Sequence, residues 1–203
     1  DGTDSGLKRL NKNVTVSKCL ESVNNLKKLN IGFDFGFMLF QPSTTFKSLK
    51  SNLGFLKQIC QDGCTPVTFL KLLPLYSTRV EKELLEAGRL IYSDGSPDYY
   101  FVEDQMNHYY EFVVKNLGKW LWDAEGLVNI SKWARNYFLV YDHFFKSNAR
   151  ISRLKGRVRQ TISESNLFLL ETMNELAEGF RSGKYTDDEQ NSLKEYRILI
   201  RER

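Results

Sequence analysis

Two short, nearly continuous apolar runs are the feature that most constrains how this chain can fold. Residues 33–40 lie between Gly32 and Pro42, and residues 67–73 end at Pro74. The length of each run, with a glycine or proline at its border, is typical of a strand that is buried on both faces. Strands of this kind lie in parallel sheets covered by helices, so the two runs predict an α/β fold.

Helical patterns surround the two runs. Residues 15–30 and 44–60 repeat apolar side chains every three or four positions, and Ser43 or Thr44 can cap the second of these helices. A capping-box pattern predicts a third helix over residues 78–88.

The order helix, strand, helix, strand, helix predicts that residues 31–40 and 67–73 are neighbouring parallel strands. Residues 15–30 and 44–60 are expected on one face of them. Because closing a barrel takes about eight strands, these two form a sector of a larger sheet.

The composition changes at a turn cluster over residues 94–97, after which the chain is predicted to be nearly all helix. We therefore expect two domains, residues 1–100 and 101–203. A last short helix is predicted after Thr186. Aromatic residues at helical spacing are usually core, and we expect the same of this stripe. Its members are Ile130, Trp133, Ala134, Tyr137, Phe138, Tyr141, Phe144 and Phe145.

Composition excludes several classes of protein. A net charge of +4 is weaker than a nucleic-acid-binding domain usually carries, and a basic stretch over residues 150–159 is expected to be a solvated helix face. No apolar run reaches the roughly 18 residues of a membrane span. The polar start, without an initiator Met, indicates the interior of a longer protein, a cleaved product or a fragment. Three cysteines form no disulfide framework, which favours the cytoplasm.

Few side chains suggest metal or acid–base chemistry. Cys60 and Cys64 are four residues apart without a third cysteine nearby, and they lie at the end of a helix, so we expect a structural role. His108 and His143 fall in helical stretches among aromatic residues and are expected to be structural as well. No metal ligand or catalytic residue is predicted within this chain.

Three segments, in order and at matching spacing, resemble the second half of radical S-adenosylmethionine (radical SAM) enzymes. Residues 1–12 resemble the end of barrel strand four, residues 36–45 resemble strand five and its loop, and residues 72–78 resemble strand six. Two positions depart from the family pattern, since Phe40 and Ser77 stand where glycine is usual. The resemblance covers residues 1–100 and implies a partial (β/α) barrel sector with parallel strands, followed by an all-helical C-terminal region.

The resemblance also implies a binding site for S-adenosylmethionine. The implied residues are Asp4, Ser5, Gly36, Phe37, Met38, Leu73 and Pro74. The two polar residues would contact the ribose or the methionyl group, and the others would line the adenine. Alternatives stay open: Asp4 can cap a helix, Phe37 and Met38 can be strand core, and Pro74 can simply end its strand.

Radical SAM enzymes also need a [4Fe–4S] cluster, held by a Cys-x3-Cys-x2-Cys motif that lies in the first half of the barrel. The resemblance therefore implies a missing N-terminal barrel half as partner, and a small-molecule or peptide substrate. It is closest to the branch with a cobalamin-binding domain, and the use of cobalamin stays open. The alternative is a non-enzymatic interaction protein derived from a barrel half.

Overall fold

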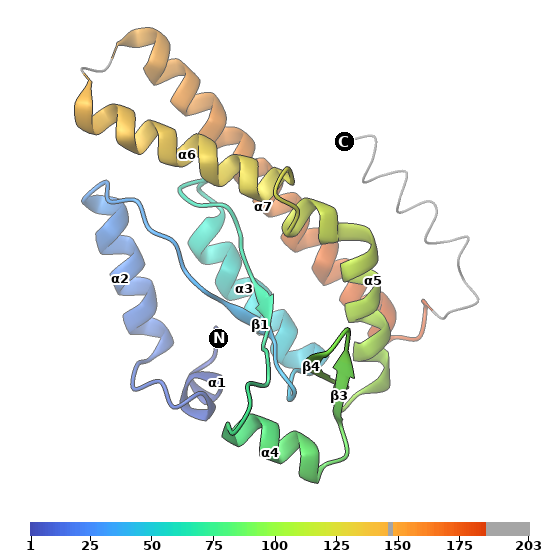
Figure 1. Cartoon of the computed structure of the whole chain (residues 1–203). Coiled ribbons are helices and arrows are strands. Elements are labelled where there is room, and N and C mark those ends of the chain that lie inside the picture. Colours follow the sequence, from blue (N-terminus) through green and yellow to red (C-terminus); the bar gives the residue numbers. More distant parts are fainter. Residues whose placement is uncertain (146–147, 186–203) are drawn as a thin grey trace.

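The computed structural model describes residues 1–145 and 148–185 of the chain (Figure 1). These residues form an α/β structure with seven helices and four short strands. The elements are α1 (Asp4–Arg9), α2 (Val16–Lys28), β1 (Met38–Phe40), α3 (Phe46–Cys60), β2 (Leu70–Lys71), α4 (Arg79–Glu86), β3 (Leu90–Ser93), β4 (Ser96–Tyr99), α5 (Asp104–Leu121), α6 (Leu127–Phe144) and α7 (Ala149–Arg181). The helix predicted after Thr186 lies outside the described residues.

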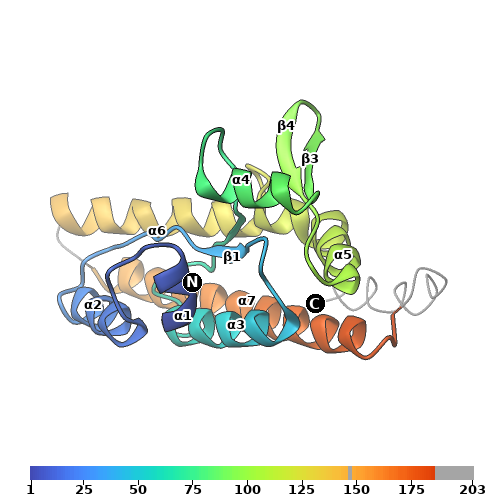
Figure 2. The ribbon, with the colours of Figure 1, turned by 90° about the horizontal axis from the view of Figure 1, so that it is seen from below.

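The predicted parallel pairing is confirmed. β1 pairs with β2 in parallel, and α3 connects the two strands. The Leu70 N–H donates to the Phe37 carbonyl at 2.9 Å, and the Leu72 N–H donates to the Phe40 carbonyl at 2.8 Å. Figure 2 shows α2 and α3 on the same side of β1, as the sequence predicts.

The strands are much shorter than the apolar runs that predict them, so the bounds 31–40 and 67–73 were wrong. Backbone groups of a strand form hydrogen bonds with a neighbouring strand. Upstream of β1, a side chain forms one of these hydrogen bonds instead. The Arg135 guanidinium donates to the Phe33 carbonyl at 2.7 Å. Burial on both faces was also wrong for the second run. Leu70 and Leu73 are 51% and 53% exposed, so this run is only partly covered by the core.

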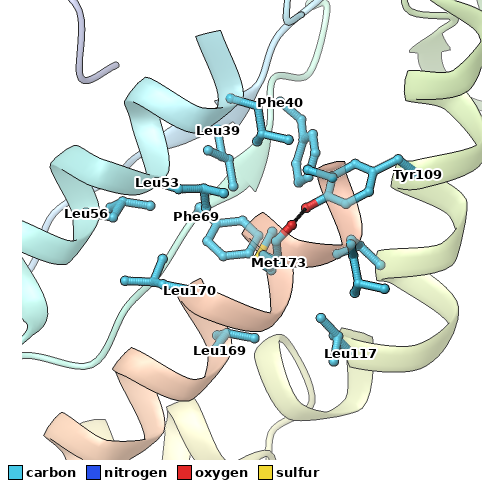
Figure 3. Close-up of a cluster of buried hydrophobic side chains, with 14 of the residues drawn as sticks. Leu39, Phe40, Leu53, Leu56, Phe69, Tyr109, Leu117, Leu169, Leu170 and Met173 are labelled. Atoms are coloured by element: carbon cyan, nitrogen blue, oxygen red, sulfur yellow. Dashed lines mark hydrogen bonds between the residues drawn. The ribbon is translucent and has the colours of Figure 1, made fainter. Parts of the chain in front are cut away.

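The core lies between β1, α3, α5 and α7, as Figure 3 shows. Leu39 and Phe40 of β1 are both fully buried, so this strand is covered on both faces as predicted. The residues packed around them include Leu53, Leu56, Phe69, Tyr109, Leu117, Leu169, Leu170 and Met173. This core continues across residue 100, where the sequence predicts a domain boundary, and ties the helical region to the sheet.

Helix α3 begins two residues later than the predicted start at residue 44, with Thr45 as its N-cap. The Thr45 hydroxyl accepts the Ser48 N–H at 3.2 Å. Thr44 does not cap the helix because its buried hydroxyl accepts the Gln41 N–H at 2.8 Å and thereby fixes the loop after β1. The predicted third helix is confirmed as α4, with Thr78 as its N-cap.

A β-hairpin, β3–β4, lies where the sequence predicts only a turn. Its two turn residues, Asp94 and Gly95, have φ angles of 50° and 76°, the left-handed pair that a type I′ turn requires. The Tyr99 hydroxyl at the end of the hairpin donates to the Phe40 carbonyl at 2.9 Å. This bond joins the hairpin to the carboxyl end of β1.

The predicted burial of the α6 stripe was wrong for most of its members. Ile130, Trp133, Tyr137, Phe144 and Phe145 are 53–72% exposed, whereas Ala134, Phe138 and Tyr141 are half-buried. Helix α6 packs on α5 and α7 along its inner side. Within the described residues, no other element covers its outer side (Figure 1).

Candidate functional site

The predicted S-adenosylmethionine residues occupy three separate places. Gly36, Phe37 and Met38 lie at the amino end of β1. Gly36 is exposed, with open space beside its Cα, and Met38 is half-buried. The Phe37 ring is buried against Phe55 of α3, with the ring centroids 5.7 Å apart, so this side chain belongs to the core.

Asp4 and Ser5 begin α1, directly after its N-cap Thr3. The Asp4 carboxylate accepts the Val16 N–H at 2.7 Å, which ties the start of α2 to α1. The Ser5 hydroxyl donates to the Thr3 hydroxyl at 3.4 Å. Asp4 thus has a structural role, because one of its carboxylate oxygens accepts a backbone N–H at the start of α2.

Leu73 and Pro74 follow β2 at the carboxyl end of the sheet. The register pairs Met38 with Leu70 and Phe40 with Lys71, so the sheet separates these two residues from Gly36 along the strand direction. At about 3.3 Å per residue, Leu73 lies on the order of 10 Å further along than the residue opposite Met38. The implied adenine residues are therefore spread over both ends of the two strands.

Polar groups gather at the carboxyl end of β1, where sites form in parallel α/β sheets. The Gln41 side-chain amide donates to the Asp1 carboxylate at 2.8 Å, so the start of the chain lies beside the end of β1. The Arg89 guanidinium donates to the carbonyls of Pro42 and Tyr100, both at 2.9 Å. A small cavity of about 110 Å³ adjoins these groups and is also lined by Arg9, Arg79 and Glu83.

Lys71 occupies a second polar place at the same end, inside an aromatic enclosure. Its ammonium lies 4.4 Å from the ring centre of Tyr110, 4.5 Å from that of Tyr99 and 5.2 Å from that of Phe101. It is 2.5 Å from the Asp98 carboxylate and donates to the Tyr99 carbonyl at 3.2 Å. Cation–π attraction and the ion pair hold this charge although the side chain is only 14% exposed.

A groove of about 210 Å³ opens beside Lys71, between the end of β2 and the hairpin, and is also lined by Ser93, Ser96, Asp98 and Tyr110. Burial, followed by the charge of Asp98, raises the pKa of the Tyr110 phenol to about 12. The phenol is therefore protonated at neutral pH. The groove offers an ammonium, a carboxylate and hydroxyl groups, a set that suits a polar ligand able to accept and donate hydrogen bonds.

Sequence reasoning missed Lys71, although a signal was present. It is the charged residue within the apolar run 67–73, and lysine is almost never buried unless it is paired. Its partners come from the hairpin and from α5. The apolar periodicity of the sequence gives no indication that these elements lie beside β2.

Cys60 and Cys64 are both held in their thiol form by their surroundings. Burial raises the pKa of the Cys60 thiol to about 12, so this group is not a thiolate at neutral pH. Burial and the adjacent Asp62 carboxylate also raise the pKa of Cys64. In the described part of the chain, no group of three or more His, Cys, Asp or Glu residues is arranged to hold a metal ion.

A larger cavity of about 320 Å³, with a mainly apolar lining, lies at the opposite end of the sheet, between α2, α6 and α7. Ion pairs hold its rim: Lys27 binds Asp62 at 2.9 Å, and Lys155 binds Asp142. Because this cavity lies at the amino ends of the strands, whereas sites in parallel α/β sheets form at the carboxyl ends, we favour the carboxyl end as the candidate site.

Comparisons with protein families, with curated proteins and with solved structures found no match to this chain. Among the described helices, none combines the length and the apolar character needed to cross a membrane.

Proposed function

We propose that this chain is the C-terminal part of a radical SAM enzyme and supplies a sector of its (β/α) barrel. The observation that carries the proposal is the parallel β1–α3–β2 unit, which agrees with the strands that the resemblance aligns with barrel strands five and six. Two strands form an incomplete sheet with open edges. Further strands on these edges would complete the barrel.

The position of the chain start supports this assignment. Asp1 lies beside Gln41, at the carboxyl end of β1. By the resemblance, residues 1–12 are the segment at the end of barrel strand four and the start of the helix after it, and strand four is the neighbour of strand five in a parallel barrel. Helix α1 begins at Asp4, so the strand itself would lie before it. An upstream strand that ends at Asp1 would therefore run alongside β1 with its carboxyl end at the candidate site.

The residues present fit only part of the implied cofactor set. The cluster ligands would come from the upstream half, because Cys60 and Cys64 are held as thiols at the other end of the sheet. If bound beside such a cluster, S-adenosylmethionine would supply a 5′-deoxyadenosyl radical, with methionine as the other product of its one-electron reduction. Gly36, Met38 and Leu73 have accessible surface but are spread over both ends of the two strands, and the Phe37 ring is buried in the core.

The chain's own contribution would be to bind and orient the substrate. The groove beside Lys71 opens at the carboxyl end of β2, and the Lys71 ammonium and the Tyr110 phenol can donate hydrogen bonds to a polar group of a small molecule or peptide. The aromatic enclosure would keep water from these donors, which strengthens their electrostatic contacts. Cobalamin would require a domain beyond this chain.

The proposal is tested by joining this chain to the coding segment upstream of it. The longer protein, reconstituted with iron and sulfide and then reduced, should convert S-adenosylmethionine to 5′-deoxyadenosine, while residues 1–203 alone should not. An upstream segment without a Cys-x3-Cys-x2-Cys motif would contradict the proposal, and so would a longer protein that carries the motif but forms no 5′-deoxyadenosine.

A second candidate, a non-enzymatic interaction protein, is favoured by the exposed aromatic face of α6. The same experiment separates the two. An interaction protein would have its own start codon close before Asp1 and no cluster-binding segment upstream.

A further inference from the structure

Helix α6 carries a continuous apolar stripe on the side that faces away from the rest of the molecule. We call the five residues Ile130, Trp133, Tyr137, Val140 and Phe144 the outer stripe; each is between 53% and 72% exposed. Their spacing of three and four residues places all of them on one face of the helix. In Figure 1, α6 runs along one rim of the molecule, at the end opposite α4, so other elements leave this face accessible.

The helix itself is firmly seated, so the outer stripe is a fixed surface. The Arg135 guanidinium on its inner side donates to the Phe33 carbonyl at 2.7 Å and to the Thr65 hydroxyl at 2.9 Å. Leu139 packs closely against Gly32, where an added Cβ would meet its Cδ1 at 2.2 Å. Val128 and Ser131 are buried. The fold thus fixes α6 through one face while the opposite face has no partner among the described residues.

The exposed apolar area of the outer stripe is large enough to mark an interaction site. An aromatic side chain buries about 150–250 Å² when it is covered, so the three rings and two aliphatic chains expose several hundred Å² of contiguous apolar surface. Patches larger than a few hundred Å² commonly mark interaction sites. Each partner of a standard interface contributes about 800 Å², so the outer stripe can supply the apolar centre of such an interface.

The outer stripe is also nearly symmetric about its central residue. Ile130 and Phe144 lie seven residues before and after Tyr137. The symmetry counterparts of Trp133 and Val140 are Tyr141 and Ala134, which are half-buried at the margin of the stripe. Two copies of α6 packed antiparallel on a twofold axis at Tyr137 would therefore place Ile130 of one copy against Phe144 of the other. Trp133 would meet Tyr141 in the same way. A surface of this kind is self-complementary, as a twofold interface requires.

Charge does not oppose such a pairing. The outer stripe contains no charged residue, and two of the charged side chains of α6 are engaged within the molecule. Arg135 binds Asp34 at 3.0 Å, and Asp142 pairs with Lys155 of α7. Asn129 and Asn136, which flank the outer stripe on one side of the helix, are neutral and can form part of the rim of the interface. Lys132 and His143, which precede Trp133 and Phe144 in the sequence, are the other polar neighbours.

From the area, the symmetry and the missing charge, we infer that α6 is the contact surface of a homodimer in which two outer stripes pack antiparallel. Trp133 and Tyr137 lie near the centre of this interface, where tryptophan and tyrosine contribute most to binding. The inference depends only on this chain and stands whether or not the chain belongs to a radical SAM enzyme.

Sedimentation equilibrium of residues 1–203 over a range of concentrations tests the inference. The chain has a mass of 23.7 kDa, and we expect a reversible equilibrium with a species of twice that mass. Tyr137→Asp should weaken the dimer by about 30-fold or more, because loss of a central anchor typically costs at least about 2 kcal/mol. Circular dichroism should show an unchanged fold, since Tyr137 is 70% exposed.

Leu85→Asp is the matched control, because Leu85 is 67% exposed on α4, at the other end of the molecule. It should leave the dimer intact, and Trp133→Asp should behave like Tyr137→Asp. A chain that stays monomeric at every concentration overturns the inference. A dimer that neither α6 substitution weakens overturns it as well, because another surface would then hold the two copies together.

Discussion

Helices α5 and α6 are consecutive, have 18 residues each and both carry aromatic residues at helical spacing, yet the fold uses them in opposite ways. Helix α5 buries its stripe in the core, including Met106, Tyr109 and Leu117. Helix α6 buries only Val128 and Ser131 and turns its stripe to the surface. The comparison teaches that periodicity identifies the apolar face of a helix, whereas the tertiary arrangement decides whether that face meets a partner.

The contacts of the two helices differ in kind. The Tyr109 ring of α5 packs beside Phe40 of β1, at 6.2 Å between centroids, and its hydroxyl donates to the Met173 carbonyl of α7 at 3.0 Å (Figure 3). Helix α6 is fixed largely through polar contacts, among them those of Arg135 to the loop before β1. Apolar burial therefore stabilises α5, and hydrogen bonds and ion pairs position α6.

The largest effect is expected from truncation in the stripe of α5. Leu117→Ala should lower the free energy of unfolding by about 2–5 kcal/mol, because it removes a fully buried side chain and leaves a cavity. Urea unfolding of both proteins measures the difference. A loss below about 1 kcal/mol would mean that α5 is not part of the main core.

The second-largest loss of stability is expected when Lys71, whose ammonium contacts Tyr110 of α5, is replaced. Lys71→Met should cost about 1–3 kcal/mol, because Asp98 loses its partner and the cation–π contact with Tyr110 disappears. Arg79→Met is the control, since the Arg79–Glu83 pair is largely exposed and such pairs contribute little. Equal losses in the two variants, measured by thermal unfolding, would argue against an enclosed ammonium.

Near the cavity that α6 covers, we predict a dependence on pH. Burial disfavours the Asp62 carboxylate, but hydrogen bonds from Lys27 and from the Cys64 N–H outweigh this effect and hold its pKa below the usual 3.8. A lowered pKa in the folded state means that Asp62 stabilises the protein above about pH 4 and that this contribution is lost on further acidification. Asp62→Asn should therefore be less stable than the natural protein at pH 7, and the difference should shrink below pH 4. A difference that is constant with pH would exclude the ion pair as its source.

The smallest effect is expected on the outer face of α6. Val140→Ala should change the free energy of unfolding by no more than about 0.5 kcal/mol at low protein concentration, because Val140 is 55% exposed. Urea unfolding checks this result. A loss as large as that of Leu117→Ala would show that the stripe is buried within the single chain.

Much of the fold follows from the sequence. The helices, the parallel order of β1 and β2 and the full burial of Leu39 and Phe40 are local or pattern-level properties, set by the 3.6-residue period and by apolar runs between glycine and proline. The strand lengths could not be predicted in this way. They depend on neighbouring strands and on side chains from distant elements. Arg135, for example, donates to the Phe33 carbonyl, which a neighbouring strand would otherwise bind.

The candidate site was less predictable than the fold. Asp4 was found to join α1 to α2, and the S-adenosylmethionine residues that the resemblance implies remain predictions. Lys71, Asp98 and Tyr110 come from three elements that are distant in sequence, so their proximity arises only when the hairpin packs on the end of β2. The sequence Asp94-Gly95 indicated a tight turn, but it could not indicate which strand the hairpin packs against.

Solvent access to Trp133 of α6 tests the central contrast most directly. The three tryptophans can be labelled with 5-fluorotryptophan, and their ¹⁹F signals can be compared in H₂O and D₂O, with Trp133→Phe used for assignment. At the lowest concentration, the Trp133 signal should show the full solvent shift, whereas Trp122, which donates to the Phe69 carbonyl at 3.1 Å, should show a smaller one. The Trp133 shift should then decrease as the concentration rises. If Trp133 is as protected as Trp122 at the lowest concentration, the outer stripe is covered within the single chain, and the contrast between α5 and α6 is wrong.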